Sequence, residues 1–355
     1  MLQYITAKEA AEKWNISQRR VSILCAESRI PNVAMLGNMW IIPRNAEKPV
    51  DARKERQAHF SGSVHPFVKW VGGKGQLIDV LKRHLPEYMG TKISKYAEPF
   101  VGGGALLFEL INTYEFEEIY INDHNKELIN VYDVVKRDCD LLISELKNLE
   151  HKYNSLSEEE QQLFYYEKRE RFNLLVLSQI TRIEKASLFI FLNKTCFNGI
   201  YRVNKKGKFN VPFGKRKSIK ICDIENLRKT SELLKNVIMK SLDYHDVLKF
   251  ADESTFVYFD PPYRPLNATS SFTSYTENDF SDEDQVKLST LFKELSEKGA
   301  KVMLSNSDPK NVNENDNFFD NLYAEYNIMR VEACRAVNSV GNKRGKIKEL
   351  LITNY

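Results

Sequence analysis

The sequence predicts an α/β protein organised around a Rossmann-like sheet with helices on both faces. The first observation is the run Phe256–Phe259, whose apolar, aromatic and β-branched residues are typical of a strand buried on both faces. The second is a strand pattern at Ser94–Pro99 that is followed by a glycine-rich loop and then by a helix, which is how nucleotide-type α/β units begin. The third is the return of strand patterns at Glu118–Ile121 and Lys301–Leu304, with helical segments between them.

An acid and two prolines end the first of these strands, in the order Asp260-Pro261-Pro262-Tyr263. Neither proline can supply a ladder N–H, so the strand stops there. A carboxylate, a rigid turn and an aromatic ring therefore meet at the carboxyl end of a buried strand, where open α/β sheets bind ligands. The alternative is an ordinary Pro-Pro turn with a solvated Asp260.

Length and composition describe an ordinary globular protein of two or three domains. The chain has 355 residues, of which 42% are hydrophobic and 28% charged. No apolar run approaches the roughly 20 residues that a membrane span needs, and the first residues carry no signal-peptide pattern. The five cysteines are far apart and the six histidines form no ligand-spaced pair. We therefore expect no disulfide framework, no metal and no membrane, and a cytoplasmic protein.

The first 47 residues predict a small helix-turn-helix head. Thr6 can cap a short helix through Trp14, and Ser17 can cap a second helix through about Arg29. Glycine and asparagine at 37–38 then separate two strand-like segments and suggest a hairpin or wing. Basic residues open the second helix, as in winged helix-turn-helix heads of the excisionase and MerR kinds, which this segment resembles. The alternative is a two-helix packing module. A polar, poorly periodic linker follows, which we place at 48–65.

Two glycine loops open the larger core. The segment Pro66–Lys74 contains paired glycines that let backbone approach a ligand, and Lys74 then starts a helix through Leu85. A plain turn is the alternative there. The second loop, at 100–105, lacks the dinucleotide spacing of glycines, yet Asp123 lies 19 residues past Gly104, where such folds place an acid on ribose hydroxyls. The alternative for Asp123 is a helix N-cap. Together these features favour an adenosine-type ligand without phosphates, such as S-adenosylmethionine.

A basic and aromatic insertion lies between two sheet segments. From Lys194 to Lys220 there are nine Lys or Arg residues and no Asp or Glu, with aromatic residues and turn pairs between them. This composition is typical of a surface that binds a polyanion carrying bases to stack on. A solvated loop, the alternative, normally mixes both signs of charge.

The remaining segments complete the predicted core. Asp243 and Tyr244 follow a strand at Val237–Ser241, another position for a ligand-edge acid and a stacking ring. Ser281 can cap a helix through about Glu297. A terminal hairpin is predicted from Tyr326–Val331 to Glu349–Thr353, and its connection, Asn338–Lys348, is expected to be mobile without a partner.

In this order the motifs resemble those of the Dam-type, adenine-specific DNA methyltransferases over about residues 66–355. The shared motifs are Phe-x-Lys-Trp-x-Gly-Gly-Lys, Glu-Pro-Phe-Val-Gly-Gly-Gly, Asn-Asp, Leu-Asn-Lys with Phe-Asn-Gly and Arg, and Asp-Pro-Pro-Tyr. The resemblance implies a catalytic domain at 66–150 and 236–355 and a target-recognition domain at 151–235. It also implies transfer of a methyl group from S-adenosylmethionine to the amino group of a flipped adenine in double-stranded DNA, most often within GATC.

The resemblance carries roles over residue by residue. Asp260, Pro261, Pro262 and Tyr263 would hold the target base. The cofactor would be bordered by Trp70, Gly73, Lys74, Glu98, Phe100, Gly102, Asp123, Asp243, Tyr244 and Asp260. DNA would meet Lys69, Phe197, Asn198, Ile200, Arg202 and Pro212, with the Phe197–Asn198 pair entering the duplex. The family often has Tyr where Phe197 stands and Arg where Lys194 stands. Stacking survives the first change, whereas a bidentate contact does not survive the second.

The chemistry agrees with this resemblance. An exocyclic adenine nitrogen is a poor nucleophile, and Asp260 with the Pro261 carbonyl can accept its two N–H bonds while Tyr263 stacks on the base. The base must leave the duplex at a cost of a few kcal/mol. We expect a monomer or weak dimer that can accompany a restriction-modification system. The rivals are the same chemistry at a longer adenine-containing site, a methyltransferase of protein glutamine or RNA, and a DNA-binding regulator on a catalytically silent core.

Overall fold

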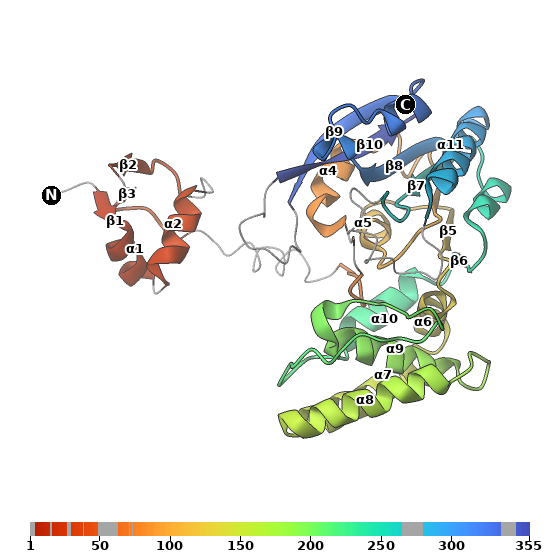
Figure 1. The fold of residues 1–355 in the computed structure, drawn as a ribbon, viewed down its shortest axis with the longest axis horizontal. Helices are drawn as coiled ribbons and strands as arrows, with labels where there is room; N and C mark the ends of the chain where they lie inside the picture. Colours follow the sequence, from red (N-terminus) through yellow and green to blue (C-terminus); the bar gives the residue numbers. More distant parts are fainter. Residues whose placement is uncertain are drawn as a thin grey trace. The chain divides into compact units, whose positions relative to one another are not determined.

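The chain divides into two compact units, Met1–Gly62 and Ser63–Tyr355 (Figure 1). The computed structural model describes residues 4–14, 16–26, 30–37, 39–48, 63–70, 72, 74–264, 280–334 and 346–355. In the part of the chain so described, no helix is long and apolar enough to cross a membrane. Each unit has its own apolar core and is considered by itself below.

The first unit packs two helices against a small antiparallel sheet. Helix α1 (Ala7–Trp14) and helix α2 (Gln18–Ala26) lie beside strands β1 (Tyr4–Thr6), β2 (Ala34–Leu36) and β3 (Met39–Pro43), in the order β1-β3-β2. Thr6 and Glu9 form a reciprocal cap at the start of α1, because Thr6 Oγ1 accepts from Glu9 N while Glu9 Oε2 accepts from Thr6 N. The hairpin predicted around residues 37–38 is β2–β3. Strand β1 was not predicted, since three residues are too few to show alternation.

The second unit is built on one seven-stranded, mostly parallel sheet in the order β6-β5-β4-β7-β8-β10-β9. The strands are β4 (Lys95–Glu98), β5 (Glu118–Asn122), β6 (Val237–Lys240), β7 (Thr255–Phe259), β8 (Lys301–Ser307), β9 (Asn327–Cys334) and β10 (Lys346–Thr353). Strand β10 alone runs antiparallel to both of its neighbours, β8 and β9. The expected connection at 338–348 is wrong at its end, because 346–348 belong to β10; residues 335–345 lie outside the described part of the chain.

Apolar side chains project from both faces of this sheet, as the predicted buried strand Phe256–Phe259 implies. On one face, Tyr96, Tyr258 and Leu351 join a core that also contains residues of α4 (Ile78–Arg83), α5 (Ala105–Thr113) and α6 (Lys126–Arg137). On the other face, Val257 and its neighbours pack with α11 (Asp282–Glu297) and α12 (Phe318–Leu322). The alternation along each strand therefore divides the core into two layers with the sheet between them.

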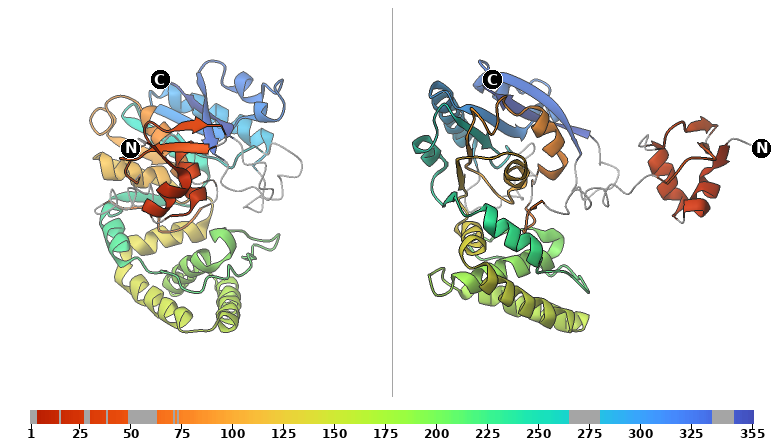
Figure 2. Two further views of the ribbon diagram at one scale, coloured as in Figure 1. Left: turned by 90° about the vertical axis from the view of Figure 1, so that its left-hand side faces the viewer. Right: turned by 180° about the vertical axis from the view of Figure 1, so that it is seen from behind.

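Four further helices extend from the first layer, beneath the sheet in Figures 1 and 2. They are α7 (Cys139–Asn154), α8 (Glu158–Leu174), α9 (Arg182–Thr195) and α10 (Ile224–Leu233). Helix α9 is buried along most of its length and contacts α6, α7 and α8. The basic segment predicted to bind a polyanion follows α9, and α10 returns the chain to α6. The expected boundary at 150–151 falls within α7.

The strand order reverses between β4 and β7, and this reversal positions the site. From β4 the chain continues outward to β5 and β6, whereas β7 lies on the other side of β4 and leads to β8. The loops that follow β4 and β7 therefore diverge to opposite faces, and the carboxyl ends of the strands between them are where sheets of this kind bind ligands.

Buried Asn122, at the end of β5, ties three strand ends together at this edge. Its Nδ2 donates to the carbonyls of Pro99 and Leu242, at 3.2 and 3.1 Å, and its Oδ1 accepts from Leu242 N at 2.8 Å. The loops after β4, β5 and β6 are thus held by one side chain.

We predict that Asn122→Ala lowers the free energy of unfolding by about 2–4 kcal/mol, because one buried and two partly buried backbone bonds are lost. Urea denaturation followed by circular dichroism measures this change. Asn327→Ala is the control, because the Asn327 amide donates to the exposed backbone of Tyr355. An equal loss in both variants would contradict the role given to Asn122.

Candidate active site

Four neighbouring strands deliver the sequence-predicted residues to one edge of the sheet. Glu98 ends β4, Asp123 follows β5, Asp243 and Tyr244 follow β6 after a short turn, and Asp260 follows β7. Since these strands are parallel and adjacent, their carboxyl ends lie side by side. The structure thus brings together residues that are up to 162 positions apart in the sequence.

Lys74 lies at the centre of this edge and faces the predicted catalytic turn. Its ammonium group is 2.8 Å from Asp260 Oδ1, 3.9 Å from Glu349 Oε2 and 4.2 Å from the centroid of the Tyr263 ring. The Tyr263 hydroxyl in turn donates to Glu349 Oε2 at 2.6 Å. Lys74 is only 5% exposed, so a single buried cation is shared by two carboxylates and a ring.

Burial raises the pKa of the Asp260 carboxyl to about 6, even though the Lys74 ammonium opposes the shift; the nearby Glu349 carboxylate adds to it. A buried carboxylate is costly without a cation or N–H groups to satisfy it. Near neutral pH this group is an anion that needs hydrogen-bond donors.

The glycine loop after β4 is shaped by aromatic side chains. Gly102 has a φ of 47°, and a Cβ at this position would lie 2.7 Å from Cδ1 of Trp70. The Gly102 carbonyl accepts from the hydroxyl of Tyr132 at 3.1 Å. A side chain at 102 is therefore excluded by both conformation and space, which keeps the backbone open for a ligand. Gly73, the other predicted loop glycine, lies outside the described residues.

Asp123 is not the helix N-cap that one interpretation of the sequence allowed. That position belongs to Asn125, whose Oδ1 accepts from Glu127 N and Leu128 N. The Asp123 carboxylate instead accepts from Gly102 N at 3.0 Å and from Asn125 N at 2.9 Å. Burial raises its pKa, and these two N–H groups counter the shift. Asp123 thereby joins the glycine loop to the end of β5.

Glu98 is the most buried acid of the site. Its Oε2 accepts from the Tyr96 hydroxyl at 2.7 Å, and burial raises the pKa of its carboxyl well above the usual range. The adjacent Phe100 ring packs against Tyr244, with centroids 5.2 Å apart. Asp243, by contrast, is exposed and accepts from the backbone N–H of His245. The Phe100–Tyr244 pair thus forms an aromatic wall, with Asp243 at its solvent end.

The predicted DNA-contacting residues gather around the end of α9. The backbone N–H and carbonyl of Lys69 bond with the Asn193 side chain, both at 2.8 Å, and Asn193 also donates to the Gly199 carbonyl. Phe197 is 52% exposed, and its N–H donates to the carbonyl of Pro212 at 2.9 Å. Asn198 next to it has a φ of 56°. The buried amide of Asn193 therefore fixes the loop that presents Phe197 and Asn198 to solvent.

Arg202, Ile200 and Pro212 lie on the same segment. Arg202 Nε donates to Asn210 Oδ1 at 2.8 Å across a short β-like pairing, which orients its guanidinium group. Ile200 is partly buried against the core, and Pro212 is exposed. Burial lowers the pKa of both Lys69 and Lys194, and neighbouring cations that include Arg216 add to this shift. These amines thus face one another without a carboxylate bonded to them among the described residues.

Three residues of the site escaped the sequence analysis. Glu349 faces Lys74 because antiparallel β10 places its beginning beside the end of β8, where Glu349 pairs with Ser307. Tyr201 stacks between Trp70 and Phe189, at centroid distances of 5.7 and 5.0 Å, and joins the glycine-loop region to α9. Asn193 makes the reciprocal bond to Lys69. The Leu-Asn-Lys motif contained a signal for Asn193, whereas no local pattern marked Glu349.

The residues at this edge of the sheet fit an adenosine-type cofactor. The side-chain-free Gly102, the acid Asp123 beside it and the Phe100–Tyr244 wall supply a backbone approach, acceptors for hydroxyl groups and apolar rings for a base. Among the residues that the structure describes, no group of His, Cys, Asp and Glu side chains is arranged to hold a metal ion.

The fold and this edge define a Rossmann-like enzyme with an acidic, ring-lined turn at the carboxyl ends of its strands. Residues 70–337 match the family model of the D12 class N6 adenine-specific DNA methyltransferases, and the chain belongs to that family. Members generally use S-adenosylmethionine as methyl donor. The match to this family argues against an enzyme that methylates protein glutamine or RNA.

Curated relatives cover most of the chain. It is 50% identical over 294 residues to the Type II methyltransferase M.MjaIII of Methanocaldococcus jannaschii, a match that spans 82% of this chain and 99% of that protein. It is 41% identical over 295 residues to the Type II methyltransferase M1.LlaDCHI of Lactococcus lactis subsp. cremoris, spanning 82% and 96%. It is 35% identical over 285 residues to the DNA adenine methylase of Escherichia coli K12, spanning 80% and 93%.

We predict that kcat/KM for DNA falls as the pH drops through about 6, because protonated Asp260 no longer accepts hydrogen bonds with both oxygens. Lys74→Met removes the cation that lowers this pKa, so the acidic limb moves to higher pH. Methyl incorporation at saturating cofactor, followed from about pH 5 to about pH 8, measures the pH profiles of the wild type and of Lys74→Met.

Lys82→Met is the matched control, because Lys82 pairs with Glu109 on the neighbouring helices and not with Asp260. Its acidic limb should coincide with that of the wild type. Two results would refute the assignment of the acidic limb to Asp260. One is a wild-type kcat/KM that does not fall down to the lowest pH, and the other is an acidic limb at the same pH in Lys74→Met and in the wild type.

Proposed function

We propose that this chain transfers a methyl group from S-adenosylmethionine to the exocyclic amino group of a flipped adenine in duplex DNA, within GATC. A longer or different adenine-containing site is the second candidate for the target. The observation that carries the proposal is the contact of the Lys74 ammonium with both Asp260 and the Tyr263 ring. The catalytic turn thus holds a nitrogen, that of Lys74, which donates to the Asp260 carboxylate and lies over the Tyr263 ring. The amino group of an adenine stacked on Tyr263 would meet the same carboxylate.

The turn can activate that amino group by accepting its hydrogen bonds. Among the described residues, no group donates to the carbonyl of Pro261, while Pro262 accepts from Gln285. Asp260 and the Pro261 carbonyl are thus the acceptors left for two N–H bonds, and together they favour a pyramidal nitrogen with an available lone pair. Lys74 must leave this position when the base enters, so its ammonium and the target amino group compete for Asp260.

The cofactor would lie along the edge between the two glycine loops. When bound, it supplies an electrophilic methyl group on a sulfonium centre. We assign Asp123 to the ribose hydroxyls, Asp243 and Tyr244 to the adenine, and the remaining contacts to Trp70, Gly73, Lys74, Glu98, Phe100 and Gly102. Support comes from the open backbone at Gly102 and from the carboxylate of Asp123 beside it. Transfer would form the nitrogen–methyl bond and break the sulfur–methyl bond, and the surplus proton of the amino group would pass to solvent water.

The basic segment after α9 would hold the duplex. Lys69, Lys194 and Arg216 raise one another's electrostatic energy, and a phosphodiester anion would relieve this repulsion. Exposed Phe197 can fill the gap in the base stack, which offsets part of the cost of flipping. Asn198, Ile200, Arg202, Pro212 and Lys69 would then face base edges. Arg202 is oriented by Asn210 and is suited to a bidentate contact with guanine.

The head would be a winged helix-turn-helix module that adds a second contact to DNA. Support comes from the α1–α2 pair with its β2–β3 hairpin and from Gln18 and Arg19, which are exposed at the start of α2. From residue 4 to residue 48 there are seven Lys or Arg and four Glu.

Two relatives carry the name Type II methyltransferase, which supports a role beside a restriction nuclease.

The reaction is tested by sequencing modified bases in DNA from cells that express the chain. We expect N6-methyladenine at GATC sites, and none from Asp260→Ala, because that variant lacks the acceptor for the amino group. Fluorescence anisotropy with a GATC duplex should show binding by Asp260→Ala within about threefold of the wild type. Methylation at another adenine-containing sequence would favour the second candidate site, and methylation by Asp260→Ala would overturn its assigned role.

The head is tested by reversing one charge in the full chain. Arg19→Glu should weaken DNA binding at low salt and reduce the slope of log K against log salt by about 1–2, because a phosphate contact becomes a repulsion. Lys293→Glu, at an exposed position of α11 in the second unit, makes the same change of charge outside the head and should leave the slope unchanged. Equal slopes for both variants would exclude DNA contact by α2.

A further inference from the structure

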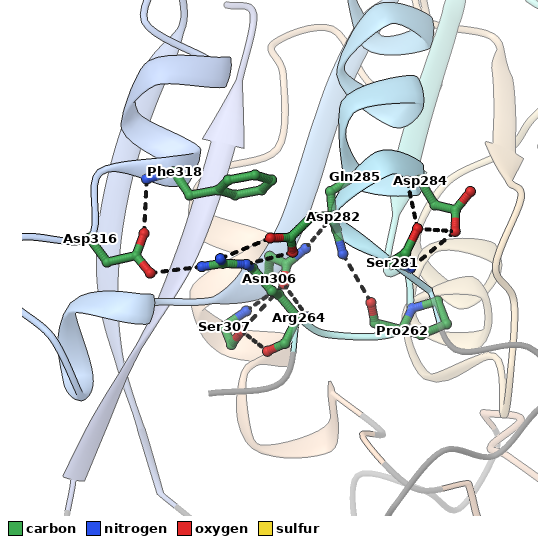
Figure 3. A network of polar contacts seen from close by, with 10 residues as sticks. All are labelled: Pro262, Arg264, Ser281, Asp282, Asp284, Gln285, Asn306, Ser307, Asp316 and Phe318. Carbon is green, nitrogen blue, oxygen red and sulfur yellow. Dashed lines mark hydrogen bonds and ion pairs between the residues drawn. The ribbon is translucent and has the colours of Figure 1, made fainter. Parts of the chain in front are cut away.

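Two buried amide side chains hold the backbone on either side of Tyr263 (Figure 3). Gln285, in the first turns of α11, donates its Nε2 to the carbonyl of Pro262 at 3.3 Å. Its Oε1 accepts from Asn306 Nδ2 at 3.1 Å. Asn306 Oδ1 in turn accepts from the backbone N–H of Arg264 at 3.3 Å. The carbonyl before Tyr263 and the N–H after it are therefore linked through one chain of amides.

Gln285 and Asn306 are polar, although apolar side chains would be enough to pack this interface. Gln285 and Asn306 are both 0% exposed, between α11 and the end of β8. Further along the same helix, Leu288 and Leu291 occupy the interface with the sheet. Burying two amides costs free energy unless their groups are bonded, and here both oxygens and both nitrogens have partners. The bonds to the turn account for their presence.

Because the turn contains two prolines, the hydrogen bonds from the buried amides determine the direction in which the chain continues to Tyr263. The rings of Pro261 and Pro262 fix both φ angles, so the freedom left in the turn is mainly in ψ. A bond to the carbonyl of Pro262 fixes ψ at that residue, and ψ there sets the direction in which Tyr263 leaves the turn. The same bond occupies Pro262, while Pro261 next to it keeps a carbonyl that no described residue uses.

Arg264 fastens the turn from the outside. Its guanidinium donates to both oxygens of Asp282, at 2.7 and 3.0 Å, and to Asp316 at 2.8 Å, and it lies 4.3 Å from the centre of the Phe318 ring. The Arg264 carbonyl accepts from Ser307 Oγ at 2.9 Å. Residue 264 is thus bonded at its N–H, its carbonyl and its side chain, so the turn has a fixed end.

We propose that Gln285 and Asn306 are positioning residues for methyl transfer, which hold the Tyr263 ring and the Pro261 carbonyl in register with Asp260. Their side chains bond to the backbone of the turn and to each other, and they act through that backbone. The inference rests on the adenine methylation that defines the family. Small displacements of groups that orient a substrate can cost on the order of 100-fold in rate.

The test uses the full chain and a DNA duplex that the wild-type enzyme methylates. Gln285→Glu keeps the shape and the acceptor for Asn306, but once it ionises it sets a carboxylate against the Pro262 carbonyl. We expect kcat to fall by about 10- to 100-fold while KM for the cofactor stays within about threefold. Lowering the pH should raise the activity of Gln285→Glu relative to wild type, because a protonated Glu can again donate. Gln285→Met should lose activity without this recovery.

Asn354→Asp is the matched control, since Asn354 bonds Ser296, Ala300 and Val302 at the far ends of the same helix and strand. It should lower Tm and leave kcat unchanged. Fluorescence of 2-aminopurine at the target position should change in the Gln285 variants and not in Asn354→Asp, because the stacking ring has moved. If a Gln285 variant fails to fold, Asn306→Asp takes its place in the same assays, because it keeps the acceptor for Arg264 but replaces the donor to Gln285 by a carboxylate oxygen.

Two results would overturn the proposal while the wild type methylates its DNA. One is a wild-type kcat in folded Gln285→Met. The other is a loss of kcat in Gln285→Glu that does not recover at low pH, together with an equal loss of kcat in Asn354→Asp when both variants have lost the same amount of Tm. An inactive wild type would instead count against the proposed function.

Discussion

The second unit depends on one buried charge and what neutralises it. Asp260 follows a strand that is covered on both faces, so its carboxylate, with 21% of the side chain exposed, is largely withdrawn from water and requires donors. In this structure Lys74 supplies them, which also holds the segment before α4 against the carboxyl edge of the sheet. The same need for donors makes the position selective for an amino group, and an amine from the chain itself occupies the place proposed for the substrate.

The topology explains why one edge can serve cofactor, base and duplex together. Four parallel strands end side by side and bring Glu98, Asp123, Asp243 and Asp260 to it, while antiparallel β10 adds Glu349 from the end of the chain. The helices α6–α10 are joined to that edge by the Lys69–Asn193 bonds and by Tyr201 against Trp70. Interactions with DNA near Phe197 would therefore act on the segment that leads to Lys74, which connects proposed recognition with the proposed catalytic turn.

The head belongs to a separate unit with its own core, and the family match begins at Trp70, after the head has ended. Its basic excess is modest, as is the charge of +4 for the whole chain. Two weak contacts on one chain can act together, because the second meets DNA at the effective concentration set by the first.

Local sequence determined the strand before Asp260, the glycine loop, the capped helices, the basic insertion and the order of motifs, because each depends on neighbours a few residues apart. The tertiary structure alone decided which distant groups meet. Nothing near Glu349 indicates that β10 runs antiparallel into the sheet, and nothing near Gln285 indicates that its amide reaches Pro262. Asp123 shows the limit most directly: its sequence position fits an N-cap, yet the loop from β4 lies close enough for Gly102 to donate to it, and Asn125 caps the helix instead. Periodicity records which face is buried, whereas strand order and side-chain contacts depend on the packing of the whole chain.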